Sequence, residues 1–347
     1  MRIIDLRGQN LSRAELLAAM PRAAMGTSEA TDLVRPILDD VKERGAAALR
    51  DFEEKFDHVR PKNLRVPVEA IKDALTTLDP EVRAAIEESV RRARAVAANQ
   101  VPKDFYTDLA EGARVAERWI PIQRVGLYVP GGKAVYPSSV LMNVIPAKVA
   151  GVEQIIMTTP PGADGKVYPS TLVAAKEAGV DAIYKVGGAQ AIAAMAFGTE
   201  SIPKVDKIVG PGNIYVALAK KAVFGYVSID SIAGPSEILV LADETANPRY
   251  VAADLLSQAE HDEMASAILI TTSRTLAGQV AAEIDRFVEK LSRKEIITKS
   301  LENYGYILVA DSLDDAIATV NEIASEHLEL VTKNPFEVMT KIRNAGA

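Results

Sequence analysis

Short apolar runs that alternate with helical patterns are the feature that most restricts the fold of this chain. Four runs in the middle of the sequence have the composition of buried strands, and they span residues 125–129, 154–158, 182–186 and 207–209. Each run ends in a turn that contains glycine or proline, and an alanine-rich helical pattern follows. Strands and helices that alternate in this way predict βαβ units and therefore a parallel, doubly wound sheet.

After Pro235 the same alternation starts again. This second series predicts strands at residues 237–241, 267–271, 306–310 and 328–332. Helices between these strands begin at Pro248, near Thr275 and at Ser312. Pro248 follows an asparagine, which is typical of the first position of a helix. The sequence therefore predicts a second Rossmann-like α/β domain.

The first hundred residues show helical patterns instead. Ser12 is placed to cap a first helix, Ser28 precedes a longer helix that ends near Phe56, and residues 82–98 form an amphipathic pattern. The simplest layout is discontinuous. One Rossmann-like domain, residues 124–235, is inserted into another, which consists of residues 1–123 with their helices and residues 236–347.

The composition excludes several classes of protein. A net charge of −7 with mixed signs along the chain, and an aromatic content of 5%, do not suit a nucleic-acid binder. No apolar run reaches the roughly 18 residues that a membrane span needs. The chain contains no cysteine, which excludes thiolate, disulfide and sulfur-ligand chemistry. The N-terminal residues lack an apolar signal core, so we expect a cytoplasmic protein.

Three turns with glycine follow strands of the inserted domain, at residues 130–133, 187–190 and 210–213. Because the carboxyl ends of parallel strands share one edge, these turns should line one crevice, where a nucleotide can bind. A single such turn is more simply a tight βα connection. Three turns together with Tyr128, Gln190 and Asn213 favour the crevice. The usual G-x-G-x-x-G motif is absent, so a dinucleotide would bind without it.

Two of the three histidines of the chain directly follow a glutamate. Gln258 and His261 lie three residues apart near the end of a predicted helix, so their side chains share one face. An amide oxygen and an imidazole can bind zinc, but they are two of about four donors that zinc takes. The spacing by itself favours an exposed helix end, where histidine also suits the helix dipole.

Glu326 and His327 lie where a predicted helix gives way to a strand. Adjacent residues at such a junction point in different directions and can serve two proton transfers in one pocket. An exposed helix end fits the pair equally well. His58 has no comparable neighbours, and we interpret it as a surface residue.

Six runs of the sequence resemble the histidinol dehydrogenase family, in that family's order and over nearly the whole chain. They are residues 125–132, 187–194, 209–213, 233–237, 255–261 and 324–328. The resemblance implies the four-electron oxidation of L-histidinol to L-histidine through L-histidinaldehyde, in two NAD-dependent hydride transfers with a catalytic zinc. This is the last step of histidine biosynthesis, and the family works as a homodimer. NAD would contact Tyr128, Gln190 and Asn213 of the inserted domain.

The resemblance also implies roles for residues of the other domain. Zinc would bind to Gln258 and His261. The substrate would contact Ser236, Gln258, His261 and His327. His327 would take the alcohol proton, and Glu326 would activate the water that hydrates the aldehyde. This agrees with the composition, because without cysteine the aldehyde must be oxidised as a hydrate, which needs a base and a polarising cation.

The family pattern continues beyond Ala347 with an aspartate zinc ligand and with a histidine ligand that a closing segment supplies across the dimer. Neither is in this sequence, so we expect weak zinc binding and poor turnover by the chain as given. Two alternatives remain open: a relative that oxidises another small polar alcohol, and an inactive nucleotide-binding fragment. We expect no nucleic-acid or membrane partner.

Overall fold

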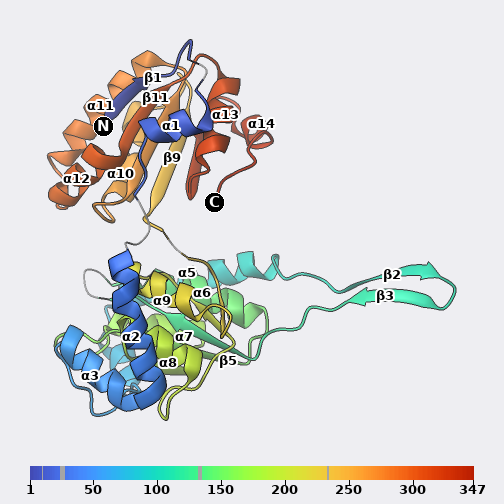
Figure 1. Cartoon of the computed structure of the whole chain (residues 1–347), viewed down its shortest axis with the longest axis vertical. Coiled ribbons are helices and arrows are strands. Elements are labelled where there is room, and N and C mark those ends of the chain that lie inside the picture. Colours follow the sequence, from blue (N-terminus) through green and yellow to red (C-terminus); the bar gives the residue numbers. More distant parts are fainter. Residues whose placement is uncertain (10, 24–27, 132–134, 233) are drawn as a thin grey trace. The chain divides into compact units, whose positions relative to one another are not determined.

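The computed structural model describes the chain except for residues 10, 24–27, 132–134 and 233. The structure divides into two compact units (Figure 1). The first unit comprises Met1–Met25 and Gly234–Ala347, and the second unit comprises Gly26–Ala233. Each unit contains one parallel five-stranded sheet, as the sequence predicts, and each is described by itself.

The sheet of the second unit has the strand order β6-β5-β4-β7-β8. Its strands are β4 (Arg124–Tyr128), β5 (Gln154–Thr159), β6 (Ala182–Lys185), β7 (Lys207–Val209) and β8 (Ser228–Ile229). The chain leaves β4 toward β5 and β6 and then returns to form β7 on the other side of β4. Ligands of doubly wound sheets bind at this reversal, outside the carboxyl ends of the strands. The reversal between β4 and β7 therefore marks the expected ligand crevice.

Helices cover both faces of this sheet. One face packs against α2 (Ser28–Arg44), α3 (Ala46–Phe56), α8 (Gly188–Phe197) and α9 (Ile214–Val223). The other packs against α4 (Val68–Thr77), α5 (Pro80–Ala98), α6 (Pro137–Val149) and α7 (Pro169–Ala178). Buried side chains such as Val34 of α2, Leu49 of α3 and Ile86 of α5 fix these contacts.

The N-terminal helices α2 to α5 thus belong with the inserted sheet. This differs from the layout expected from the sequence, which groups residues 1–123 with residues 236–347. The physical reason is that the apolar faces of these helices are buried against α7, α8 and α9. The predicted single helix up to Phe56 is also two helices, because Gly45 adopts a φ of 56° between α2 and α3.

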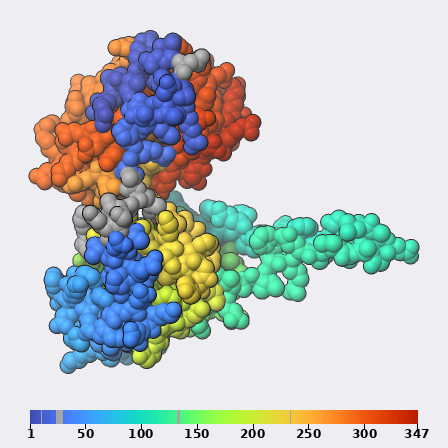
Figure 2. Space-filling view, viewed as in Figure 1, coloured from blue at the N-terminus to red at the C-terminus, as the bar shows by residue number. Residues whose placement is uncertain are grey.

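An antiparallel hairpin that the sequence analysis did not predict projects from the second unit (Figures 1 and 2). It consists of β2 (Phe105–Ala110) and β3 (Ala113–Glu117), and all residues of both strands are exposed. Large apolar side chains are among them, namely Phe105, Tyr106, Leu109 and Val115. A hairpin of two strands is marginally stable by itself in water, so this arm needs packing partners.

The sheet of the first unit has the order β1-β11-β10-β9-β12. Its strands are β1 (Arg2–Asp5), β9 (Glu237–Ala242), β10 (Ser266–Thr271), β11 (Gly305–Val309) and β12 (His327–Val331). On one face lie α10 (Pro248–Ala259), α11 (Arg274–Val288) and α12 (Lys294–Tyr304). On the other lie α1 (Arg13–Ala19), α13 (Leu313–Ile323) and α14 (Pro335–Met339). Beside the edge strand β12, the backbone of Ala347 hydrogen-bonds to Glu326 and Leu328.

Candidate functional site

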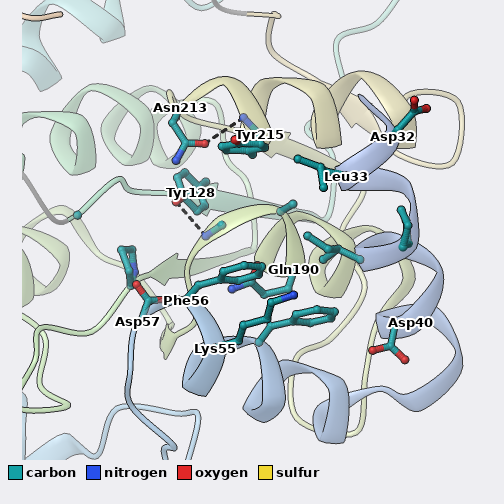
Figure 3. A pocket seen from close by; sticks show the side chains of 17 residues that line it. Asp32, Leu33, Asp40, Lys55, Phe56, Asp57, Tyr128, Gln190, Asn213 and Tyr215 are labelled. Atoms are coloured by element: carbon teal, nitrogen blue, oxygen red, sulfur yellow. Dashed lines mark hydrogen bonds between the residues drawn. The ribbon is translucent and has the colours of Figure 1, made fainter. Parts of the chain in front are cut away.

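A cavity of about 930 Å³ lies in the second unit at the carboxyl edge of its sheet (Figure 3). Tyr128 is the last residue of β4, Gln190 lies in the first turn of α8, and Asn213 is the N-cap of α9. All three side chains line the cavity. The structure thus brings together the three residues that the sequence analysis assigned to the nucleotide. Phe56 and Asp57, at the end of α3, also line the cavity, and Phe56 lies beside Gln190 (Figure 3).

Glycine is required after the ends of two strands, β7 and β6. Gly210 has a φ of +113°, and a Cβ there would lie 2.1 Å from the carbonyl oxygen of Tyr128. Gly188 has a φ of +60°, and its N–H donates to the Tyr128 hydroxyl at 3.1 Å. Both glycines therefore lie close to Tyr128 of β4, and Gly188 lines the cavity. Gly131 lines the cavity too, whereas Gly132 and Lys133 of the first predicted turn lie outside the described residues.

Two acidic residues beside this cavity were not predicted from the sequence. Glu53 of α3 is fully buried, and Asp57 follows four residues later at the end of the helix. Burial, and after it the charge of Asp57, raise the pKa of Glu53 to about 8. Burial also raises the pKa of Asp57. The sequence contained one signal, because Glu53 follows Leu49 by four residues and so falls on the buried face of its helix.

In the first unit, the predicted residues gather at the amino-terminal edge of the sheet. Ser236 directly precedes β9, Glu326 directly precedes β12, and His327 begins β12. Gln258 and His261 lie at the end of α10, which runs from the carboxyl end of β9 back to the start of β10. The placement is opposite to the carboxyl-edge rule for such sheets, and sequence periodicity did not reveal it.

The strand register and the packing of α10 place Gln258 and His327 on one face of this sheet, at the same edge. Val331 packs in the core on the α10 side, so His327 and Glu329 point to the same side by alternation. Glu329 hydrogen-bonds to Asp254 of α10. From that contact, two strand residues back to His327 span about 6.7 Å, and four helix residues on to Gln258 span about 6 Å. Both steps lead toward the amino-terminal edge, so the two residues lie at about the same level of the sheet.

The same contact perturbs a carboxyl group near the site. Burial, and after it the charge and hydrogen bond of Asp254, raise the pKa of Glu329 to about 7. Glu329 is therefore partly protonated near neutral pH, beside the carboxyl group of Asp254. The sequence analysis missed this pair, because the two residues are distant in the chain and meet only through the packing of α10 on the sheet.

Ser236 and Glu326 complete the group. Ser236 lies two residues before Ile238, which is the register partner of His327, so it alternates onto the α10 side as well. Glu326 Oε2 accepts a hydrogen bond from the N–H of Glu237 at 3.2 Å. Glu326 Oε1 lies 3.9 Å from His327 Nε2. An amide, a hydroxyl, an imidazole and a carboxylate therefore share one edge of the sheet.

The described residues do not form a complete metal centre. His261 is exposed just beyond α10, and its N–H donates to the carbonyl of Gln258 at 3.0 Å. Among the residues that the structure describes, no group of three or more His, Asp or Glu side chains could hold a metal ion. Gln258 and His261 thus offer two donors of suitable type for zinc. His58 is exposed, as the sequence analysis expects.

Comparisons with known proteins agree on one family. The sequence profile of a family described as histidinol dehydrogenase matches residues 20–347. A histidinol dehydrogenase of Bifidobacterium longum is 66% identical, over 100% of this chain and 76% of that protein. A histidinol dehydrogenase of Clostridium acetobutylicum is 53% identical, over 94% of this chain and 76% of that protein.

A solved structure agrees as well. The crystal structure of histidinol dehydrogenase from Elizabethkingia anophelis superimposes with a TM-score of 0.94 at 37% identity, and the match covers 99% of this chain and 79% of that one. Separately, none of the helices in the described part of the chain is long and apolar enough to cross a membrane.

Proposed function

The chain belongs to the histidinol dehydrogenase family, whose members are oxidoreductases that catalyse the last step of histidine biosynthesis, and from this premise we propose that it oxidises L-histidinol to L-histidine with NAD as hydride acceptor and zinc as catalytic metal. The observation that carries the proposal is the placement of Gln258, His327 and Ser236 on one face at one sheet edge. This edge combines metal-ligating, proton-accepting and hydroxyl groups.

NAD would bind in the cavity of the second unit. The cavity volume of about 930 Å³ lies toward the upper end of the usual range for ligand pockets. Tyr128, Gln190 and Asn213 line it at the strand reversal where nucleotides bind in such sheets. Gly131 and Gly188 line the cavity, so backbone lies at its wall, where a phosphate or ribose can approach it.

Zinc would be held by Gln258 and His261, with the substrate supplying further donors. Histidinol carries an amine and an imidazole, and both are nitrogen ligands that zinc accepts. When bound, the metal would polarise the oxygen that is oxidised. Ser236 would orient the substrate at the same edge.

His327 and Glu326 would handle the protons. In the first oxidation His327 takes the alcohol proton while the carbon-bound hydride goes to NAD, which produces the aldehyde. Glu326 then removes a proton from water, which adds to the aldehyde carbon as a hydrate. Loss of a second hydride to a second NAD, together with two protons from the hydrate, produces the carboxylate, so three protons are released in all. Two NAD and one water are consumed for each L-histidine formed.

We further propose a cytoplasmic homodimer. The apolar side chains of the hairpin, Phe105, Tyr106, Leu109 and Val115, are exposed in one chain. Burial against a second copy would remove this apolar surface from water. A homodimer would also let a neighbouring chain complete the zinc coordination.

The metal assignment is tested by the zinc content of two variants. Gln258→Ala and His261→Ala each remove one donor, so zinc bound after dialysis should fall at least tenfold below the unmodified chain. Gln190→Ala, on the other unit, is the matched control and should retain zinc. Unchanged zinc content in both edge variants would refute the ligand role. If the chain binds NAD but shows no turnover in the presence of zinc, it is better described as an inactive nucleotide-binding fragment. If it oxidises another small polar alcohol in preference to histidinol, it is a relative with a different substrate.

A further inference from the structure

A buried carboxyl group beneath the nucleotide cavity has no part in the proposed hydride transfers. Glu53 Oε1 accepts hydrogen bonds from the N–H of Gly187 and from the side-chain amide of Gln190, each at 3.0 Å. These two donors belong to the turn and first helical turn that line the cavity (Figure 3). Glu53 therefore holds the turn before α8 and the first turn of α8, which lines the proposed nucleotide cavity.

The hydrogen bond from Gln190 to Glu53 fixes the orientation of the Gln190 side-chain amide. Because Glu53 Oε1 takes a donor, the amide turns its nitrogen toward Glu53 and its oxygen toward Gly188. The Gln190 oxygen lies 2.6 Å from the position that a Cβ of Gly188 would occupy. Gly188 itself lines the cavity. Gln190 thus presents a hydrogen-bond acceptor to the cavity, which suits a hydroxyl group of a nucleotide.

The second oxygen of Glu53 faces another acid. Within the described part of the chain, Glu53 Oε2 is buried and receives no hydrogen-bond donor. The adjacent carboxyl group is that of Asp57. A buried carboxylate beside a half-buried one cannot keep both charges without a cost. A proton on Glu53 Oε2 that is donated to Asp57 removes the repulsion and gives Oε2 a partner.

The other titratable groups around the pair do not neutralise it. Tyr128 of β4 faces both acids, and its pKa is raised, first by burial. His58 acts on Asp57 from the solvent side. Lys55, Asp32 and Asp40 line the cavity. The α8 neighbours of Glu53 are a backbone amide and Gln190, which carry no charge.

We propose that Glu53 is a positioning residue for NAD: as a neutral carboxylic acid it holds the Gly187 turn and the Gln190 amide through Oε1 and donates its own proton to Asp57 through Oε2. This inference rests on the proposed NAD-binding function. When Glu53 loses its proton, two adjacent charges repel, and the helix end with Asp57 moves away from the turn. NAD affinity should therefore decline as pH rises through about 8.

The test measures NAD binding to the purified chain by calorimetry for three variants. Glu53→Gln reproduces the neutral acid, because its oxygen accepts and its nitrogen donates, so the Kd for NAD near pH 7 should stay within about twofold of the unmodified chain. Glu53→Leu keeps the volume but leaves the N–H of Gly187 and the Gln190 amide without their acceptor, so it should weaken NAD binding at least tenfold and also lower the melting temperature. Glu54→Leu, the exposed neighbour on α3, is the matched control and should bind normally.

The pH profile separates positioning from general support of the fold. Between about pH 7 and about pH 9.5 the unmodified chain should lose NAD affinity, whereas Glu53→Gln should show a flat profile. Normal NAD binding by a folded Glu53→Leu variant would overturn the proposal. If that variant does not fold, a Glu53→Gln profile that parallels the unmodified chain would overturn it. Absence of NAD binding by the unmodified chain would instead refute the proposed function itself.

Discussion

At the scale of single residues, the register between α10 and β12 decides which side chains can share chemistry. The contact between Asp254 and Glu329 sets the position of α10 along β12. One helical turn further on, Gln258 reaches the level of His327. The two residues are 69 positions apart in the sequence, and only this packing makes them a pair. The role of His327 can therefore be separated from that of the metal ligands.

Replacement of His327 by asparagine removes the proposed proton acceptor but keeps a polar side chain. Steady-state NADH formation from histidinol should fall by about 10² to 10⁴-fold, the usual contribution of a general base. NAD affinity and zinc content should remain nearly unchanged, because neither proposed site uses this side chain. His58→Asn, at an exposed position, serves as the control. Unchanged turnover in His327→Asn would show that another group accepts the proton.

At the scale of elements, the sequence predicted the strands well and the placement of helices less well. All eight predicted strands are present with small shifts at their ends, because buried parallel strands are short apolar runs bounded by turns. The strands β1 and β8 and the helix α12 were not predicted. Their patterns are short or mixed, and their pairing depends on distant residues. The association of α2 to α5 with the inserted sheet is likewise a tertiary property.

The nucleotide-site residues could be predicted because glycine turns at strand ends are a local signal. The buried pair Glu53 and Asp57 and the amino-terminal edge site in the first unit could not be located in this way. Their positions follow from helix packing and from the direction of α10. The sequence shows which residue types suit the chemistry, but it does not show which of these residues lie together in the folded chain.

The turn at Gly210 allows a direct test at this scale. Gly210→Ala introduces a Cβ that would contact the Tyr128 carbonyl, in addition to strain from the positive φ. We expect a loss of about 2 to 4 kcal/mol in the free energy of unfolding and weaker NAD binding. Gly225 also has a positive φ, of +104°, but a Cβ there meets nothing within 4 Å. Gly225→Ala should cost only about 1 kcal/mol. Equal effects in chemical denaturation would contradict the close approach of β4 and β7.

At the scale of the whole molecule, the hairpin formed by β2 and β3 matters most, because all residues of both strands are exposed in one chain. Tyr106→Ser together with Leu109→Ser should shift the protein from dimer toward monomer in light scattering, because these two exposed side chains would lose their apolar contacts. Ser replacements of Val82 and Val96, exposed apolar residues of α5, are the control and should leave the mass unchanged. A dimer that survives the hairpin changes would place the interface elsewhere.

The central claim is that one chain type carries out both oxidations at one sheet edge, with NAD as the acceptor. The most direct measurement is the ratio of NADH formed to L-histidine formed by the purified chain with zinc, NAD and L-histidinol. We expect two NADH for each histidine, with no free aldehyde. A ratio of one with accumulation of the aldehyde, or no NADH at all, would contradict it.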